Sequence, residues 1–127
     1  MPVERVQTLA IGIAQDMPTD LGPPYTIFKL GDDELCGMGP LPPDMQAQGV
    51  PPKWNAYINV DDLETALEKA VSLGATVFMP SMQVMEAGWM AGIVDPTGGH
   101  VFLWQKNRHV GSMRVNETAC YCWNELA

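Results

Sequence analysis

The chain has 127 residues, of which 46% are hydrophobic, so it is long enough for one compact domain with an apolar core. Its formal net charge of −8 argues against nucleic acid or an anionic membrane surface as a partner. The sequence contains no apolar run of about 18 residues, which a membrane-spanning helix needs, and no secretory pattern at its start.

Cysteine and histidine are scarce. The three cysteines, Cys36, Cys120 and Cys122, are an odd number at spacings that suggest no disulfide framework. A reducing compartment is the simplest interpretation, so we expect a cytoplasmic protein. With two histidines in the chain, a closed four-ligand zinc site is not expected.

The first part of the chain predicts a hairpin. The opening residues fit either a short helix over Val3–Ile13 or a strand over Thr8–Ala14, and both alternatives stay open. Tyr25–Gly31 and Glu34–Gly39 have strand composition and are joined by a Gly-Asp-Asp turn. The Pro- and Gly-rich stretch Gly39–Pro52 is then interpreted as a linker.

The middle of the chain carries the clearest pattern. Aromatic, β-branched and polar residues nearly alternate in PKWNAYINV, which predicts a strand over Pro52–Val60. Asn55, Tyr57 and Asn59 would share one face of this strand.

A helix and three strands follow. We expect Asp61 to cap the helix, with Glu64 as its capping-box partner, and Gly74 to end it in the left-handed conformation. The apolar stripe of this helix is Leu63, Ala66, Leu67, Ala70 and Val71. The predicted strands are Ala75–Met79 (stopped by Pro80), Gly88–Val94 and Gly99–Gln105.

The end of the chain also has strand composition. ACYCWNEL, Ala119–Leu126, alternates in the way a strand does. A single terminal strand must pair with another strand, because its backbone groups and apolar side chains would otherwise stay exposed.

The unit of strand, helix and three strands resembles the module of the vicinal oxygen chelate superfamily, which includes glyoxalases, bleomycin-resistance proteins and extradiol dioxygenases. The resemblance is carried by NVDDLETALEKAVSLGATV (Asn59–Val77) and by IVDPTGGHVFLWQ (Ile93–Gln105), whose DPTGG turn is the most specific piece. It covers about Asp16–Val110, and the earlier part looks like the two-domain, hydroxylase-like branch.

This resemblance implies an α+β fold in which paired βαβββ modules form a curved mixed sheet around a cup that holds the ligand. We expect a single glyoxalase-like domain over residues 1–127, with a partial first module at 1–45 and a complete second module at 52–106.

The chain departs from the family pattern at both ends. The start lacks the opening strand of the first module, whereas residues 118–127 look like such a strand. The displaced strand would fill the empty place within the chain, as in a circular permutant, or across a homodimer as a swapped strand. Alternatively, the chain simply runs on into a following domain.

Metal-dependent members of the superfamily place their ligands on the first and last strands of each module. In this sequence those positions fall on Asn55 and Phe102, and phenylalanine cannot bind a metal. In the first half, Cys36 would be a soft thiolate ligand without other ligands beside it. Glu125 would add only one carboxylate. We therefore expect no metal and no cofactor.

The family geometry instead implies an aromatic cup with a few polar tips. Such a cup suits a flat or cationic organic ligand, and the acidic chain would attract a cation. Either Trp89 or Met90, and either Trp123 or Glu125, would face inward, depending on register. The candidate ligand-binding residues are Asn55, Tyr57, Trp89, Met90, His100, Phe102, Trp104, Trp123 and Glu125.

Plainer interpretations exist for the same residues. His100 follows a turn and His109 lies in a basic loop, so both could simply be solvated. Phe102 and Trp104 also fit plain core packing. Asp95 is interpreted as a turn former.

Three functions therefore stay open. The first is a metal-independent protein that binds a small organic molecule and forms a homodimer. The second is a lyase, isomerase or hydroxylase-like enzyme of the same superfamily. The third is an interaction module that needs a partner domain. The scarcity of histidine and inward carboxylates favours the first.

Overall fold

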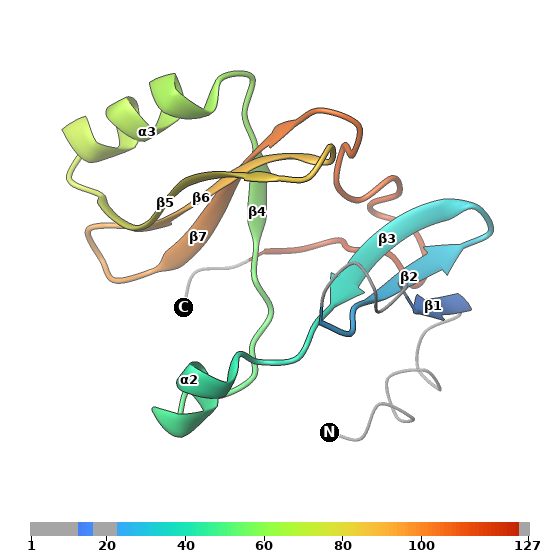
Figure 1. The fold of residues 1–127 in the computed structure, drawn as a ribbon. Coiled ribbons are helices and arrows are strands. Elements are labelled where there is room, and N and C mark those ends of the chain that lie inside the picture. The colour runs from blue at the N-terminus through green and yellow to red at the C-terminus, as the bar shows by residue number, and fades with distance from the viewer. Residues whose placement is uncertain (1–12, 17–22, 125–127) are drawn as a thin grey trace. The chain divides into compact units, whose positions relative to one another are not determined.

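A computed structural model describes residues 13–16 and 23–124 (Figure 1). The chain divides into two compact units. Unit 1 contains the part of the chain up to Lys53 together with Ser112–Trp123, and the main part of unit 2 is Trp54–Gly111. Among the described residues, no helix has the length and apolar character that crossing a membrane requires.

Unit 1 is built on a three-stranded antiparallel sheet in the order β1-β2-β3, with β1 at Ile13–Asp16, β2 at Thr26–Leu30 and β3 at Asp33–Met38. The predicted hairpin is confirmed, and its turn places Gly31 at φ +64°. The predicted linker also contains a short helix, α2 at Pro43–Ala47, whose first position is a proline. Of the two alternatives for the opening residues, β1 agrees with a strand at Ile13 and Ala14. Residues 1–12 lie outside the described part.

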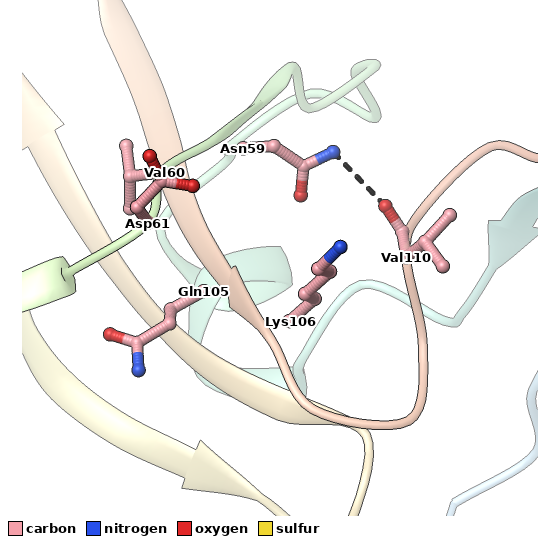
Figure 2. Close-up of a pocket in the computed structure, with 6 residues that line it drawn as sticks. All are labelled: Asn59, Val60, Asp61, Gln105, Lys106 and Val110. Carbon is pink, nitrogen blue, oxygen red and sulfur yellow. Dashed lines mark hydrogen bonds between the residues drawn. The ribbon is translucent and has the colours of Figure 1, made fainter.

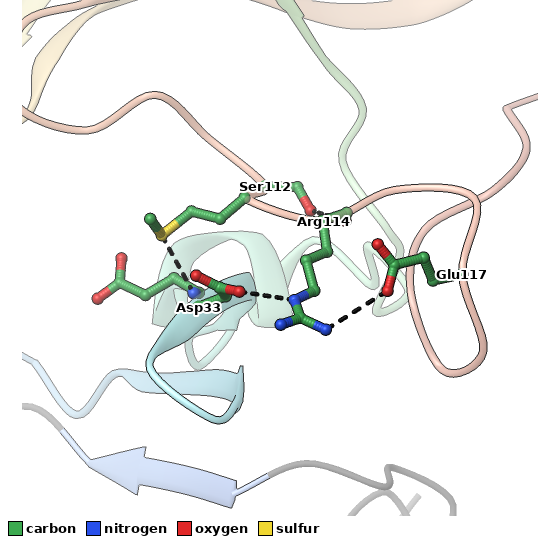
Figure 3. Close-up of polar contacts among 6 residues, drawn as sticks. Asp33, Ser112, Arg114 and Glu117 are labelled. Carbon is green, nitrogen blue, oxygen red and sulfur yellow. Dashed lines mark hydrogen bonds and ion pairs between the residues drawn. The ribbon is translucent and has the colours of Figure 1, made fainter.

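The segment after β7 returns to β3 in unit 1 (Figure 3). The Arg114 guanidinium donates to Asp33 at 2.6 Å and to Glu117 at 3.4 Å. The Met113 amide donates to the Glu34 carbonyl at 2.8 Å, and the Glu34 amide in turn donates to the Met113 sulfur at 3.3 Å. These contacts fix the segment along the edge of the hairpin.

The predicted terminal strand is wrong for its described part, Ala119–Asn124, which forms no strand. A single parallel bridge joins Val115 to Tyr121. The backbone is left-handed at Asn116 (φ 61°) and Ala119 (φ 65°), so the chain turns back instead of extending. Residues 125–127 lie outside the described part.

Unit 2 has a four-stranded sheet in the order β4-β7-β6-β5. Its elements follow the predicted order of strand, helix and three strands: β4 at Tyr57–Asn59, α3 at Leu63–Ser72, β5 at Thr76–Val84, β6 at Gly88–Val94 and β7 at His100–Lys106. β4 runs parallel to β7, whereas the other pairs are antiparallel, so the sheet is mixed as an α+β fold predicts. Helix α3 covers one face of this sheet (Figure 1).

The core of unit 2 lies between α3 and the sheet. The apolar stripe of the helix meets alternate residues of β6 and β7, and the buried members are Leu63, Leu67, Ala91, Ile93 and Leu103. Burying one such leucine contributes about 1.5–3 kcal/mol. Among the described residues of unit 2, no helix covers the opposite face of the sheet.

Two predicted boundaries around β4 and α3 are wrong. The strand expected over Pro52–Val60 is confined to Tyr57–Asn59. Backbone hydrogen bonds with β7 extend only from the Ala56 carbonyl to the Val60 amide, and the two prolines earlier in the segment lack N–H donors. The helix is capped by Asp62 and not by Asp61: the Asp62 carboxylate accepts a hydrogen bond from the Thr65 amide at 2.7 Å.

The expected capping box is also wrong, since Glu64 accepts a hydrogen bond from the Ser81 hydroxyl instead. Pro80 does not stop β5, which continues to Val84. β5 is an edge strand, and its pairing with β6 shifts register between Val77 and Met79 and again between Met79 and Met82. A proline is tolerated at such an irregularity because no ladder hydrogen bond is required of it.

Candidate functional site

The face of the unit 2 sheet opposite α3 carries a set of aromatic and thioether side chains, and we call it the open face. Alternation along β7 puts His100, Phe102, Trp104 and Lys106 on this face and leaves Leu103 to the core. Cross-strand pairing extends the set across the neighbouring strands. Its other members are Tyr57, Asn59, Phe78, Met82, Met90 and Gly92.

The rings of the open face form one continuous row. Phe102 stacks on Tyr57 with ring centroids 5.0 Å apart and planes at 21°. Phe78 meets the edge of Phe102 at 5.5 Å and lies 5.2 Å from the ring of His100. Tyr57 meets Trp104 edge-on at 6.4 Å. Tyr57 is 50% exposed and Phe78 43%, so aromatic surface stays available to a ligand.

Two glycines of β6 let these rings lie against the backbone. A Cβ atom at Gly92 would contact the tip of the Phe78 ring, with two of its carbons at 2.8 Å. A Cβ at Gly88 would contact Cζ2 of Trp104 at 2.7 Å and the carbonyl of Gln105. Any side chain at these two positions would therefore lift a ring from the sheet.

A loop after β7, residues 107–111, closes one end of the open face. The Trp104 indole N–H donates to the His109 carbonyl at 2.9 Å, and the Asn59 amide donates to the Val110 carbonyl at 3.0 Å. The Gly111 amide donates to Nδ1 of His109 at 3.0 Å, which ties the imidazole ring to the loop backbone. His109 is thus part of a structured loop and not the simply solvated residue that its position in the sequence suggested.

A pocket of about 360 Å³ opens at this end of the sheet (Figure 2). The residues that line it are Asn59, Val60, Asp61, Gln105, Lys106 and Val110. Figure 2 shows the Lys106 ammonium pointing toward the Asn59 side chain across the hollow. The Gln105 side chain is fixed by α3, since its Oε1 accepts a hydrogen bond from the Leu63 backbone amide at 2.7 Å.

The structure brings together five of the nine candidate residues, namely Tyr57, Met90, His100, Phe102 and Trp104. The register selects Met90, because Trp89 lies on the other face and packs against the α3 core.

The remaining three candidates are Asn55, Trp123 and Glu125. Asn55 is exposed and lies before the start of β4. Trp123 is 75% exposed and belongs to unit 1, and Glu125 lies outside the described residues.

Sequence reasoning missed Phe78 and the two polar residues Asn59 and Lys106. Asn59 alternates with Tyr57, and Lys106 continues the alternation of β7 by one step, so both could have been found from strand periodicity. Phe78 could not, because the bulges of β5 decide which face it meets.

The residues described by the structure do not fit the divalent metal of the metal-dependent superfamily members. No group of three His, Cys, Asp or Glu side chains comes together within this part of the chain. Phe102, on which the resemblance places a ligand position, is stacked on Tyr57. Desolvation raises the pKa of the Cys36 thiol, which disfavours the thiolate that a metal would need.

The chain is similar to proteins named as glyoxylases. It is 44% identical to "Putative glyoxylase CFP32" of Mycobacterium bovis over 102 residues, which are 80% of this chain and 39% of that protein. The protein of the same name from Mycobacterium tuberculosis matches equally. A match of 28% identity over 87 residues, 68% of this chain and 32% of the relative, is to "Anthracycline biosynthesis protein DauV" of a Streptomyces species.

This chain therefore spans well under half the length of these relatives. No protein-family model matches it. The similarity to the glyoxylases supports the resemblance to the glyoxalase-like superfamily that the DPTGG turn and the order of elements indicate.

Proposed function

We propose that this chain binds a small organic molecule on the open face of a glyoxalase-like module, and that binding needs no metal. The observation that carries the proposal is the continuous ring row, in which Phe102 is held between Tyr57 and Phe78 while much of their surface stays exposed. An apolar surface with a few polar tips is typical of small-molecule sites.

A flat ring system suits this surface best. Aromatic rings prefer offset-stacked or edge-to-face contacts, and both geometries already occur within the row. Met82 and Met90 add flexible, polarizable side chains that adapt to different ligands. The name of DauV associates that relative with anthracyclines, which are fused-ring aromatic compounds, and this agrees with a planar ligand.

The open face would be one wall of a cup that a second module completes, as in bleomycin-resistance proteins. A swapped terminal segment in a homodimer is one route to such a cup. Sedimentation equilibrium distinguishes the states: a mass of two chains supports the homodimer, and a mass of one chain contradicts it.

An enzymatic role is the second candidate, and the observation in its favour is the position of His100. This exposed imidazole lies at one end of the ring row, 5.2 Å from Phe78, where it could act on a bound molecule. The relatives named as glyoxylases are consistent with such chemistry. Loss of turnover of a cup-bound compound in His100→Ala, with binding kept, would support it.

Thermal shift with planar neutral and cationic compounds tests the binding proposal, because a ligand that binds only the folded chain raises Tm. Tyr57→Ala should abolish the shift. The matched control is Ile58→Ala, since Ile58 lies next along β4, is also 50% exposed, and points to the other face. The shift should survive in excess EDTA. Equal shifts in the two variants would contradict the ring row, and loss of the shift in EDTA would contradict metal independence.

A further inference from the structure

The pocket at the end of the open face contains a positive charge beside the ring row. Lys106 is two residues beyond Trp104 on the same face of β7, which is roughly 7 Å along the strand. Asn59 is the cross-strand neighbour of Trp104. A molecule stacked on Tyr57 and Trp104 would therefore extend into the pocket through a short arm.

Lys106 is available for a ligand. It is exposed, and none of the ion pairs between described residues includes it. The nearby Arg108 differs, because it pairs with Glu86.

The Asn59 side chain is held in place by a hydrogen bond to the loop after β7. Its amide N–H is fixed by the Val110 carbonyl, which leaves the side chain at the rim of the pocket, facing Lys106 (Figure 2). The pocket thus offers one cation, the Lys106 ammonium, beside the fixed Asn59 side chain.

We propose that the bound organic molecule carries an anionic group, such as a carboxylate, which Lys106 binds in this pocket while the ring system stacks on the open face. The inference rests on the proposed function and adds the charge of the ligand. Asp61 lines the same pocket, so its carboxylate weakens the attraction and limits the preference. The ligand class is therefore a ring-bearing organic acid and not the cationic compound that the net charge of the chain alone favours.

Three probes that share one ring test the proposal: 2-naphthylacetate, 2-naphthylacetamide and 2-(2-naphthyl)ethylammonium. Calorimetric titration of the full chain at low ionic strength should give about 3- to 5-fold tighter binding of the acetate than of the amide, as expected for one partly exposed charge pair. High salt should remove this difference.

Charge variants then assign the preference to the pocket. Lys106→Gln should remove the preference, so that the acetate binds no more tightly than the amide, and Asp61→Asn should increase the preference for the acetate. Lys69→Gln is the matched control, because it removes one positive charge from the exposed surface of α3 and should keep the preference. A Tm measurement confirms that each variant is folded.

The outcomes separate the two proposals. If all three probes bind in a Tyr57-dependent manner but the acetate shows no Lys106-dependent preference, or the ammonium binds best, the anionic site is overturned and the ring site stands. If no probe binds, or if Tyr57→Ala binds the probes as well as the unsubstituted chain does, the proposed ring site is wrong. The proposed anionic site, which depends on it, is then wrong too.

Discussion

Replacing Gly92 by alanine tests how the ring row is built. Gly92 lies under the Phe78 ring, and an added methyl group would lie 2.8 Å from two ring carbons. Ordinary contacts between carbons are about 3.5–4.0 Å, so the ring must move by about 1 Å. It can move, because Phe78 is 43% exposed, but the movement disturbs its edge contact with Phe102.

The magnitude follows from two opposing terms. Alanine in place of glycine inside a strand gains about 0.5–1 kcal/mol. Loss of the contact between Phe78 and Phe102 costs about 0.5–1.5 kcal/mol. Gly92→Ala alone should therefore change the free energy of unfolding by between a gain of about 0.5 and a loss of about 1 kcal/mol.

Whether Gly92→Ala stabilises the protein depends on the presence of the Phe78 ring. In Phe78→Ala the ring is absent, so Gly92→Ala should stabilise by the full backbone term of about 0.5–1 kcal/mol. Urea unfolding of the four proteins of this double-mutant cycle measures the coupling, which should be about 0.5–1.5 kcal/mol. If the two substitutions are additive within about 0.3 kcal/mol, Phe78 does not lie on Gly92 and the ring row is wrong at this position.

Three further predictions concern stability. Leu103→Ala should destabilise by about 2–5 kcal/mol in urea unfolding, because the side chain is 6% exposed in the α3 core; a loss below about 1 kcal/mol would contradict this packing. Hydrogen bonds from Thr65 lower the pKa of Asp62, so its stabilisation is present above the ordinary aspartate pKa of about 3.9 and is lost as the pH falls below it. Asp62→Ala should lower Tm at neutral pH but not at strongly acid pH, whereas a decrease that does not depend on pH would argue against the cap. Arg114→Gln should speed hydrogen exchange at the Met113 amide, and unchanged exchange would show that the ion pair does not hold this segment.

The sequence predicts the regular part of unit 2 because local chemistry and tertiary pairing agree there. Gly88–Val94 is bounded by turns that its own residues encode, and the structure gives β6 the predicted limits. The left-handed backbone at Gly74 also follows from the residue type, with φ at +98°. At such positions no distant partner is needed to choose the conformation.

Other features depend on contacts that a sequence pattern does not contain. Asp61 and Asp62 can both cap a helix with a carboxylate. The pairing of β4 with β7 decides which of the two is the N-cap. The Val60 amide still donates to the Trp104 carbonyl, so the helix starts only after this last ladder bond. The conformation of the loop at the end of the open face likewise depends on side-chain hydrogen bonds from Trp104 and Asn59 to backbone carbonyls. No sequence motif predicts these hydrogen bonds.

The geometry of the open face also limits how binding and catalysis can coexist in unit 2. A group that transfers a proton must lie within hydrogen-bond reach of the reacting atom. His100 and Lys106 are the two end residues of β7, and the six residue-to-residue steps between them span roughly 20 Å. A two-ring acid anchored at Lys106 therefore ends near Tyr57 and Phe102, beyond the reach of His100. If a reaction that depends on His100 is found for a compound of this size, Lys106→Gln should not affect it, because the compound must then bind at the other end of the row.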